Sequence, residues 1–153
     1  MLIEDEIIFN TSLGNIKIVS KKEEVVSIDF TEHKIKHSNS LILNKSKNQI
    51  EDYLSGRRTI FDILINPHGT NFQKKVWKQL SLIPYGITIS YLKLSVLLKT
   101  SPRAIGNACG KNPILIVIPC HRVISNKGAL TGFSAIGGVN TKKRLLKIEK
   151  IKI

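Results

Sequence analysis

The stretch Ile116–Val123 constrains the fold of this chain more than any other. Its first three residues are apolar and β-branched, which is typical of a buried strand. Pro119 ends that run, and Cys120, His121 and Arg122 follow at once. Neighbouring side chains of a regular strand point to opposite faces, so a contact between Cys120 and His121 requires the strand to break. We therefore expect a turn at Cys120, with the two side chains bridged by a group such as a water molecule.

Two interpretations of Cys120 remain open at this point. An isolated cysteine beside an apolar run is usually a small core residue with an inert thiol. A reactive thiolate, in contrast, needs a base or a cation close to it, and His121 and Arg122 are the nearest candidates. These residues alone support a nucleophile and a core cysteine about equally.

Composition narrows the class of protein. With 153 residues and 42% hydrophobic content, the chain can bury one core or two small ones. It contains no run close to the roughly 18 apolar residues of a membrane span, and its first residues lack the features of a signal peptide. Its two cysteines are therefore expected to be reduced thiols of a cytoplasmic protein. The histidines are scattered without zinc-site spacing, so we predict no metal and no cofactor.

Charge divides the chain into two parts. The net charge is +13, but the residues up to Gly69 carry nine Lys and Arg against ten Asp and Glu. From Thr70 onward there are fifteen Lys and Arg and a single acid, Glu149. So basic a segment indicates an anion-binding surface, most often for nucleic acid, although a lysine-rich solvated face is the alternative. A lone carboxylate in that setting is expected to have a specific partner.

The first part, residues 1–69, has the pattern of a small α+β domain. Two β-rich runs flank a Gly-Asn turn and predict a hairpin, and a third run alternates apolar and polar residues. A polar loop is expected from Thr31 to Lys47, then a helix from Ser46 or Lys47 to Leu54, closed by Gly56. A further strand is expected over Thr59–Ile65. The three runs are Ile7–Asn10, Ile16–Val19 and Val25–Phe30.

The second part, residues 70–153, has the pattern of a helical domain. Thr70 and Gln73 have the spacing of a capping box, and apolar residues then recur at helical spacing. Trp77 is expected in the core rather than as a platform for bases. Ser90 caps a second helix, and a third helix starts at Ser101-Pro102 and ends at Gly110. The expected apolar positions of the second helix are Tyr91, Leu94, Val96, Leu97 and Leu98.

The last two of these helices have the length and the tight connection of a helix-turn-helix. A helix that reads base edges in the major groove carries Arg, Asn, Gln or Lys on its exposed face. Pro102–Cys109 consists mostly of Ala, Gly, Ile and Cys, with Arg103 at its start. Such a smooth helix suits a close approach to DNA without sequence reading, and Arg103 could enter the base stack or bind phosphate. An ordinary helix hairpin with a surface arginine is the alternative.

Together these motifs resemble the O6-alkylguanine-DNA alkyltransferase family. The similarity runs from Phe72 to Glu149, about half of the chain, and the residues up to Gly69 match only in size and strand-rich character. The motifs, in the order that the family has them, are Val76-Trp77, Ile83-Pro84-Tyr85-Gly86, Ser90-Tyr91, Ser101–Gly106, Asn112-Pro113, Pro119–Val123, Gly132-Phe133-Ser134 and Leu145-Leu146 with Glu149.

The resemblance implies a reaction. Members of the family repair O6-alkylguanine, and to a lesser extent O4-alkylthymine, by moving the alkyl group irreversibly to their own cysteine. Cys120 matches that acceptor, His121 matches the residue that takes the thiol proton through a water, and Glu149 matches the carboxylate that orients the histidine. Tyr91 matches the residue that supplies a proton to guanine N3. The implied enzyme is a single-turnover methylated-DNA–protein-cysteine methyltransferase without a cofactor.

The resemblance also implies how DNA is held. Arg103 matches the finger that fills the base stack when the nucleotide is flipped out, and Asn112 matches the hinge after the recognition helix. Arg122 is expected at the DNA, with a structural role in pinning the local turn as its alternative. The expected DNA contacts are Arg103, Ser101, Tyr91, Ala104 and Arg122, and the expected substrate-binding residues are Asn112, Val123, Phe133, Ser134 and Lys142.

The chain departs from the family pattern at Phe133, where many members have tyrosine, and in the loop that follows it. The loop Ser134–Val139 is about two residues longer than the family's glycine-rich loop, which leaves the size of the alkyl pocket open. Cys109 matches no functional residue and is expected to be a core thiol. A disulfide between Cys109 and Cys120 is not expected, because it would consume the nucleophile.

We therefore expect an α+β protein, with a small strand-rich N-terminal domain, residues 1–69, and a mostly helical C-terminal domain, residues 70–153, that contains the helix-turn-helix and the active-site cysteine. Its expected partner is double-stranded DNA containing alkylated guanine, bound by a monomer without a membrane. A related protein that binds damage without repairing it is disfavoured by Cys120. A helix-turn-helix regulator is disfavoured by the smooth helix and by Glu149.

Overall fold

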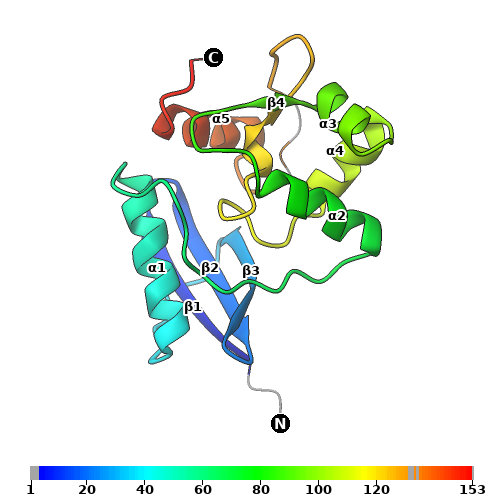
Figure 1. Ribbon diagram of the computed structural model, residues 1–153. Coiled ribbons are helices and arrows are strands. Elements are labelled where there is room, and N and C mark those ends of the chain that lie inside the picture. Colours follow the sequence, from blue (N-terminus) through cyan, green and yellow to red (C-terminus); the bar gives the residue numbers. More distant parts are fainter. Residues whose placement is uncertain (1–3, 131–132, 134, 153) are drawn as a thin grey trace. The chain divides into compact units, whose positions relative to one another are not determined.

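The computed structural model describes residues 4–130, 133 and 135–152, and it divides the chain into two compact units (Figure 1). The first unit ends at His68 and also includes Pro113–Leu115, whereas the second unit contains Gly69–Asn112 and the chain from Ile116 onward. A three-stranded sheet with one helix forms the first unit, and helices dominate the second. The predicted α+β class is therefore confirmed. Among the described residues, no helix combines the length and the apolar character needed to cross a membrane.

The sheet of the first unit is an antiparallel meander of β1 (Glu4–Thr11), β2 (Gly14–Lys21) and β3 (Glu24–Thr31). The predicted hairpin between β1 and β2 is confirmed. In the second hairpin, Lys22 and Glu23 have φ values of 50° and 62°, as both central residues of a type I′ turn require. Such a turn matches the right-handed twist of the strands, so two non-glycine residues adopt the left-handed conformation.

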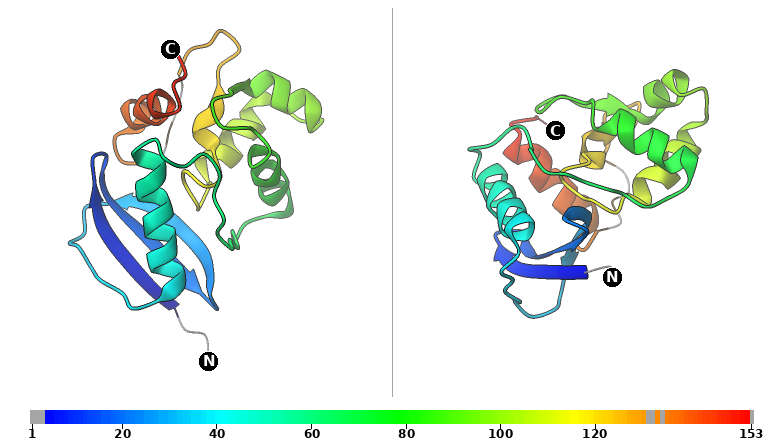
Figure 2. Two further views of the ribbon diagram at one scale, coloured as in Figure 1. Left: turned by 60° about the vertical axis from the view of Figure 1, so that its left-hand side comes forward. Right: turned by 60° about the horizontal axis from the view of Figure 1, so that its bottom comes forward.

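The helix of the first unit, α1 (Leu41–Leu54), packs across one face of the sheet (Figure 2). Ile7 and Phe9 share a face of β1 because side chains alternate along a strand. Lys47 of α1 lies over the Phe9 ring, 5.9 Å from its centroid, so this is the face toward the helix. Ile7 pairs with Ile18 of the next strand, and both are at most 2% exposed. The core of the first unit therefore lies between this face and α1.

α1 begins earlier than predicted, at Leu41, and part of the predicted loop is helical. The Ser40 hydroxyl accepts the Leu43 N–H at 3.3 Å and caps the helix. The buried stripe of α1 includes the polar residues Ser46 and Gln49, which weakened the helical pattern in the sequence. The predicted end at Leu54 is confirmed.

The predicted strand over Thr59–Ile65 is wrong. Within this fully described segment, Ile65 alone forms a β-bridge, opposite Val25. The Gln49 side chain takes the place of a neighbouring strand, since its Nε2 donates to the Asp62 carbonyl at 3.3 Å and its Oε1 accepts the Asp62 N–H at 2.9 Å. A backbone segment whose polar groups are satisfied by a side chain does not need sheet pairing.

In the second unit, α2 (Asn71–Leu80) begins with the predicted capping box. The Thr70 hydroxyl accepts the Gln73 N–H at 3.1 Å, and Gln73 Oε1 accepts the Thr70 N–H at 2.9 Å. Trp77 is buried, as predicted, and donates its indole N–H to the Ala108 carbonyl at 2.8 Å. This bond holds α2 against the helix that carries Ala108.

α3 (Tyr91–Leu97) and α4 (Pro102–Gly110) form the predicted helix pair. Each begins at the predicted serine, Ser90 or Ser101, whose hydroxyl accepts a backbone N–H from the first turn. The apolar pattern of α3 was only partly correct, because Val96 is 69% exposed. A seven-residue helix makes only two turns, so few of its residues can face the core.

The predicted strand at Ile116–Ile118 is wrong, although the burial of Ile116 and Ile118 was predicted correctly. These residues form turns, and Ile116 has a φ of 73°, in the left-handed region that β-branched residues avoid. One turn of 3₁₀ helix, η1 (Cys120–Arg122), follows. Strand structure begins only after it, where β5 (Val123–Ile124) pairs in parallel with β4 (Ile89–Ser90).

The last helix of the second unit, α5 (Gly138–Ile148), packs against η1. Leu145 and Leu146 are its fully buried apolar residues. Gly137 precedes the helix with a φ of 90°, and a Cβ atom there would collide with the Thr141 side chain. Glycine is therefore required at the start of α5.

Candidate active site

Cys120 lies at the end of a tight turn that is centred on Pro119. Pro119 has a φ of −83° and a ψ of 63°, the backbone of an inverse γ-turn, and the Cys120 N–H donates to the Ile118 carbonyl at 2.8 Å. The Nδ2 group of Asn112 donates to the same carbonyl, also at 2.8 Å. The predicted turn at Cys120 is confirmed, and two donors to one carbonyl hold it in place.

The Cys120 thiol is uncharged at rest. It is 4% exposed, and burial raises its pKa above the ordinary value. A hydrogen bond from Asn112 and the positive charge of Lys142 oppose this rise in pKa without overcoming it. The cations near Cys120 therefore do not make it a resting thiolate, because the desolvation of the buried charge is the larger effect. Chemistry at this sulfur requires a group that removes the thiol proton.

Glu149, which follows the last residue of α5, accepts hydrogen bonds from the two residues after Cys120. It is 3% exposed, and its Oε2 atom lies 2.7 Å from His121 Nε2. Oε2 also accepts from Arg122 Nη2 at 3.1 Å, while Oε1 accepts from Arg122 Nε at 2.8 Å and from the Gly86 N–H at 3.0 Å. The specific partner that the sequence predicted for the lone acid of the basic part is therefore present.

These contacts decide the charge of His121. Burial alone would raise the pKa of Glu149, but the hydrogen bonds from His121 and Arg122 lower it to about 2. An ionised carboxylate only accepts hydrogen bonds, so the proton of this contact resides on His121 Nε2. Burial lowers the pKa of His121, the charges of Arg122 and Lys142 lower it further, and Glu149 does not compensate fully. His121 is therefore neutral, with its lone pair on Nδ1.

Arg122 is buried and makes several contacts within the second unit. Its side chain is 8% exposed, and its Nη1 group donates to the Ile83 carbonyl at 2.7 Å. Its remaining contacts are the two oxygens of Glu149 and the Tyr85 ring, whose centroid lies 5.8 Å from Cζ. The expected DNA contact of Arg122 stays a prediction. Its alternative role, in pinning the local turn, agrees with these contacts.

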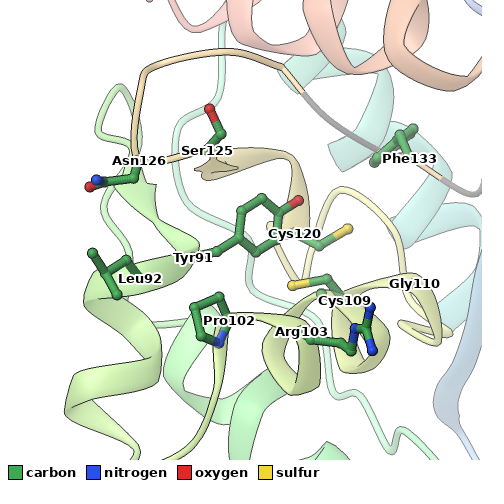
Figure 3. Close-up of a pocket in the computed structure, with 11 residues that line it drawn as sticks. Tyr91, Leu92, Pro102, Arg103, Cys109, Gly110, Cys120, Ser125, Asn126 and Phe133 are labelled. Carbon is green, nitrogen blue, oxygen red and sulfur yellow. The ribbon is translucent and has the colours of Figure 1, made fainter.

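A cavity of about 680 Å³ in the second unit has Cys120 in its wall (Figure 3). Figure 3 shows the side chains of Tyr91, Cys109 and Cys120 gathered together, although they come from α3, α4 and η1. Arg103 and Phe133 belong to the same wall. Among the described residues, the wall is formed by Tyr91, Leu92, Pro102, Arg103, Gly106, Cys109, Gly110, Cys120, Ser125, Asn126 and Phe133.

Lys142 reaches this cavity through Tyr91. It is fully buried, its Nζ group donates to the Tyr91 hydroxyl at 3.3 Å, and Nζ lies 5.5 Å from the centroid of the ring. Burial lowers the pKa of Lys142, while the nearby thiols of Cys120 and Cys109 act against this lowering. The Lys142 ammonium therefore lies beside the Tyr91 hydroxyl, which the family resemblance implies as a proton donor.

The other predicted residues are only partly brought together. Ser101 and Arg103 are exposed at the start of α4, and Ala104 is half-buried beside them. Val123 is fully buried in β5 and is absent from the cavity wall, and Ser134 lies outside the described residues.

Sequence reasoning missed Cys109, Ser125 and Asn126 as residues of the cavity wall. The position of Cys109 could have been found, because Pro102, Gly106 and Cys109 are spaced i, i+4 and i+7 and share one face of α4. Ser125 and Asn126 lie beyond β5, in a segment without a periodic pattern.

The chain matches two family descriptions. Residues 71–151 match the DNA-binding domain of 6-O-methylguanine DNA methyltransferase, and residues 6–67 match the ribonuclease-like domain of the same family. The methylated-DNA–protein-cysteine methyltransferase of Methanosarcina barkeri is 37% identical over 152 residues, which cover 94% of this chain and 95% of that protein. The protein of the same name from Metallosphaera sedula is 37% identical over 145 residues, covering 92% and 90%.

Solved structures give the same result. The O6-methylguanine methyltransferase of Mycobacterium tuberculosis superposes with a TM-score of 0.86 at 32% identity, covering 97% of this chain and 93% of that one. The structure of Mycobacterium tuberculosis OGT in complex with DNA superposes with a TM-score of 0.85 at 34% identity, covering 94% of this chain and 91% of that one.

Proposed function

This chain belongs to the methylated-DNA–protein-cysteine methyltransferase family, which repairs DNA by alkyl transfer, and we propose that Cys120 is the residue that accepts the alkyl group. The observation that carries this assignment is a buried thiol in a cavity wall, directly before a neutral histidine that a carboxylate holds. Cys109 shares the wall and burial raises its pKa to about 12, but the next residue is Gly110, whereas Cys120 directly precedes the histidine that Glu149 holds.

In the proposed reaction, His121 acts as the base. The thiol proton of Cys120 moves through a water molecule to Nδ1 of His121, and the sulfur attacks the alkyl carbon on guanine O6. The carbon–sulfur bond forms as the carbon–oxygen bond breaks, and the electron pair of that bond stays with the guanine. The imidazolium that results faces the ionised Glu149, which stabilises it.

Tyr91 is the proposed proton donor to the leaving base. Its hydroxyl accepts from Lys142 Nζ and can pass its own proton to guanine N3, so that the base leaves neutral. The phenolate that remains is stabilised by the buried Lys142 ammonium, 3.3 Å from the oxygen. Two proton transfers thereby balance the charges of the nucleophile and the leaving group.

The nucleotide is proposed to enter the cavity after flipping out of the duplex. A volume of about 680 Å³ lies within the range of pockets that hold a ligand the size of a base. Arg103 is exposed at the cavity wall on the first turn of α4, where it can fill the gap in the base stack. Ser101 and Ala104, beside it, are the proposed contacts to the DNA backbone.

Further properties follow from this chemistry. The thioether formed on Cys120 is stable, so each molecule reacts once. The alkylated base is O6-alkylguanine in double-stranded DNA, and one chain supplies all the residues proposed for the reaction, so a monomer suffices. The proposed location is the cytoplasm, where thiols stay reduced.

Mixing the protein with a duplex that contains O6-methylguanine tests this function. Intact mass should increase by one methyl group per molecule, and peptide mapping should place it on Cys120. Cys120→Ser should abolish the transfer, and Cys109→Ser, which alters the same cavity wall, should retain it. Methylation of Cys109, or transfer by the Cys120→Ser variant, would overturn the assignment. Binding without any transfer by the unaltered protein would favour damage recognition alone.

A further inference from the structure

Arg122 donates hydrogen bonds to the carboxylate of Glu149, which in turn holds His121. Its guanidinium group donates to both oxygens of Glu149, at 2.8 and 3.1 Å, and its third nitrogen donates to the Ile83 carbonyl at 2.7 Å. The arginine side chain is 8% exposed and the glutamate side chain is fully buried. Because arginine stays protonated at every ordinary pH, this geometry places a permanent positive charge against Glu149.

We propose that Arg122 is a positioning residue for the transfer reaction, which cancels the charge of Glu149 and so keeps His121 uncharged, with its proton on Nε2 and its lone pair on Nδ1. This inference rests on the proposed function, in which Nδ1 takes the proton of Cys120. Arg122 itself does not touch the reacting sulfur; it acts through Glu149 and His121.

The charges around His121 explain why Arg122 matters. Glu149 follows α5, Lys142 lies on α5, and Arg122 lies on η1 beside the neutral thiol of Cys120. Burial of the ring is the largest effect that disfavours imidazolium, and one negative and two positive charges act on the ring in addition. Without Arg122, the carboxylate 2.7 Å from Nε2 would lose the cation that donates to both of its oxygens. The pKa of His121 would then rise, and the protonated fraction of the ring could not accept a proton from Cys120.

The removal of Arg122 should thus have a measurable direction. An uncompensated carboxylate at hydrogen-bond distance raises the pKa of a histidine by about 1–3 units. In the unaltered protein, the pKa of His121 lies below its ordinary value, so the base remains active into mildly acidic solution. The single-turnover transfer rate falls at low pH, where His121 becomes protonated, and this part of the pH–rate profile is its acid limb. In Arg122→Met, the acid limb should move to a higher pH, by on the order of one pH unit or more.

A charge-conserving variant separates this effect from the loss of structure. Arg122→Lys keeps the positive charge but loses the two-pronged contact, so it should lower stability, although by less than Arg122→Met, which leaves the buried carboxylate without this cation. Its acid limb should nevertheless remain close to that of the unaltered protein. The double variant Arg122→Met with Glu149→Gln removes both charges. Its acid limb should lie at a lower pH than that of the single Met variant, toward that of the unaltered protein. Equal shifts in the Lys and Met variants would show that Arg122 acts through structure alone.

Direct titration of His121 in the unaltered protein completes the test and needs no alkyl transfer. The ring protons of His121, assigned by comparison with His121→Asn, should titrate in nuclear magnetic resonance spectra below the pH expected of an exposed histidine. An imidazolium at neutral pH in the unaltered protein would overturn the inference, even if transfer to Cys120 occurs. Absence of transfer together with a neutral His121 would count against the proposed function and leave the role of Arg122 supported.

Discussion

Replacement of Glu149 by glutamine is expected to damage both the stability and the chemistry of this protein. The carboxylate accepts hydrogen bonds from Gly86 and His121 and from two nitrogens of Arg122. Glutamine has the same size but only one acceptor oxygen, so its NH₂ group must face donors. When the amide oxygen keeps the hydrogen bonds from the Gly86 N–H and from Arg122 Nε, the NH₂ group faces His121. His121 then has to accept at Nε2 and carry its proton on Nδ1, which removes the base.

The cost in stability follows from the buried arginine. Removal of one partner of a buried ion pair typically costs about 3–5 kcal/mol, because the other charge stays buried without compensation. The pKa of Glu149 gives a similar figure. A fall from the ordinary 4.5 to about 2 corresponds to about 3 kcal/mol of interaction with the ionised form, at about 1.4 kcal/mol per unit. For a chain of this length, 3 kcal/mol lowers the melting temperature by about 6–12 °C.

Thermal unfolding and single-turnover transfer measure the two effects. The control is Asp52→Asn, which breaks an exposed ion pair with Arg57 and should cost less than about 1 kcal/mol. The transfer rate of Glu149→Gln, measured well below its melting temperature, should fall by up to about 10²–10⁴-fold. A melting temperature equal to that of the control would refute the energetic argument. An unchanged rate would refute the orienting role of Glu149.

Three further outcomes can be measured. DNA affinity should fall roughly a hundredfold between 50 and 200 mM salt if about four phosphates are contacted. Affinity should also differ little between undamaged sequences, and a strong sequence preference would contradict the inference that the smooth helix α4 does not read base edges. Arg103→Ala should slow transfer from duplex DNA far more than transfer from a free O6-alkylguanine, and equal slowing would place Arg103 outside the flipping step. The second unit should lose stability in acid. Because the folded-state pKa values of His121 and Glu149 are both lowered, stability present above about pH 6.5 should decline below it and again below about pH 4.5. A melting temperature that is constant down to pH 3 would contradict this.

Features determined by neighbouring residues could be predicted from the sequence. The capping box of Thr70 and Gln73 needs only a hydroxyl and an amide three residues apart, and both hydrogen bonds are present. The turn before Cys120 follows from the fixed φ of Pro119. The contact of His121 with Glu149 was predicted through the family resemblance, because residues 28 positions apart have no local pattern that joins them.

Features that depend on distant partners could not be predicted in this way. The segment Thr59–Ile65 has strand-like composition, but Gln49 of α1 satisfies its central backbone groups and replaces a sheet neighbour. Arg122 follows a cysteine and a histidine, where a surface role at DNA is plausible. Its burial depends on the Ile83 carbonyl and on Glu149, which only the folded chain brings together.

Ile116 shows the same limit for backbone conformation and leads to a last prediction. Its β-branched side chain suggests a strand, yet it has a φ of 73° and is 1% exposed, whereas Ile118, also 1% exposed, has no positive φ. Alanine and glycine at each position remove the side chain and isolate the backbone. At 116, glycine should be more stable than alanine by about 1–2 kcal/mol, because only glycine adopts the left-handed region without strain. At 118, glycine should be less stable than alanine by about 0.5–1 kcal/mol. Chemical unfolding of the four variants measures both differences, and differences of the same sign at the two positions would refute the strained turn before Cys120.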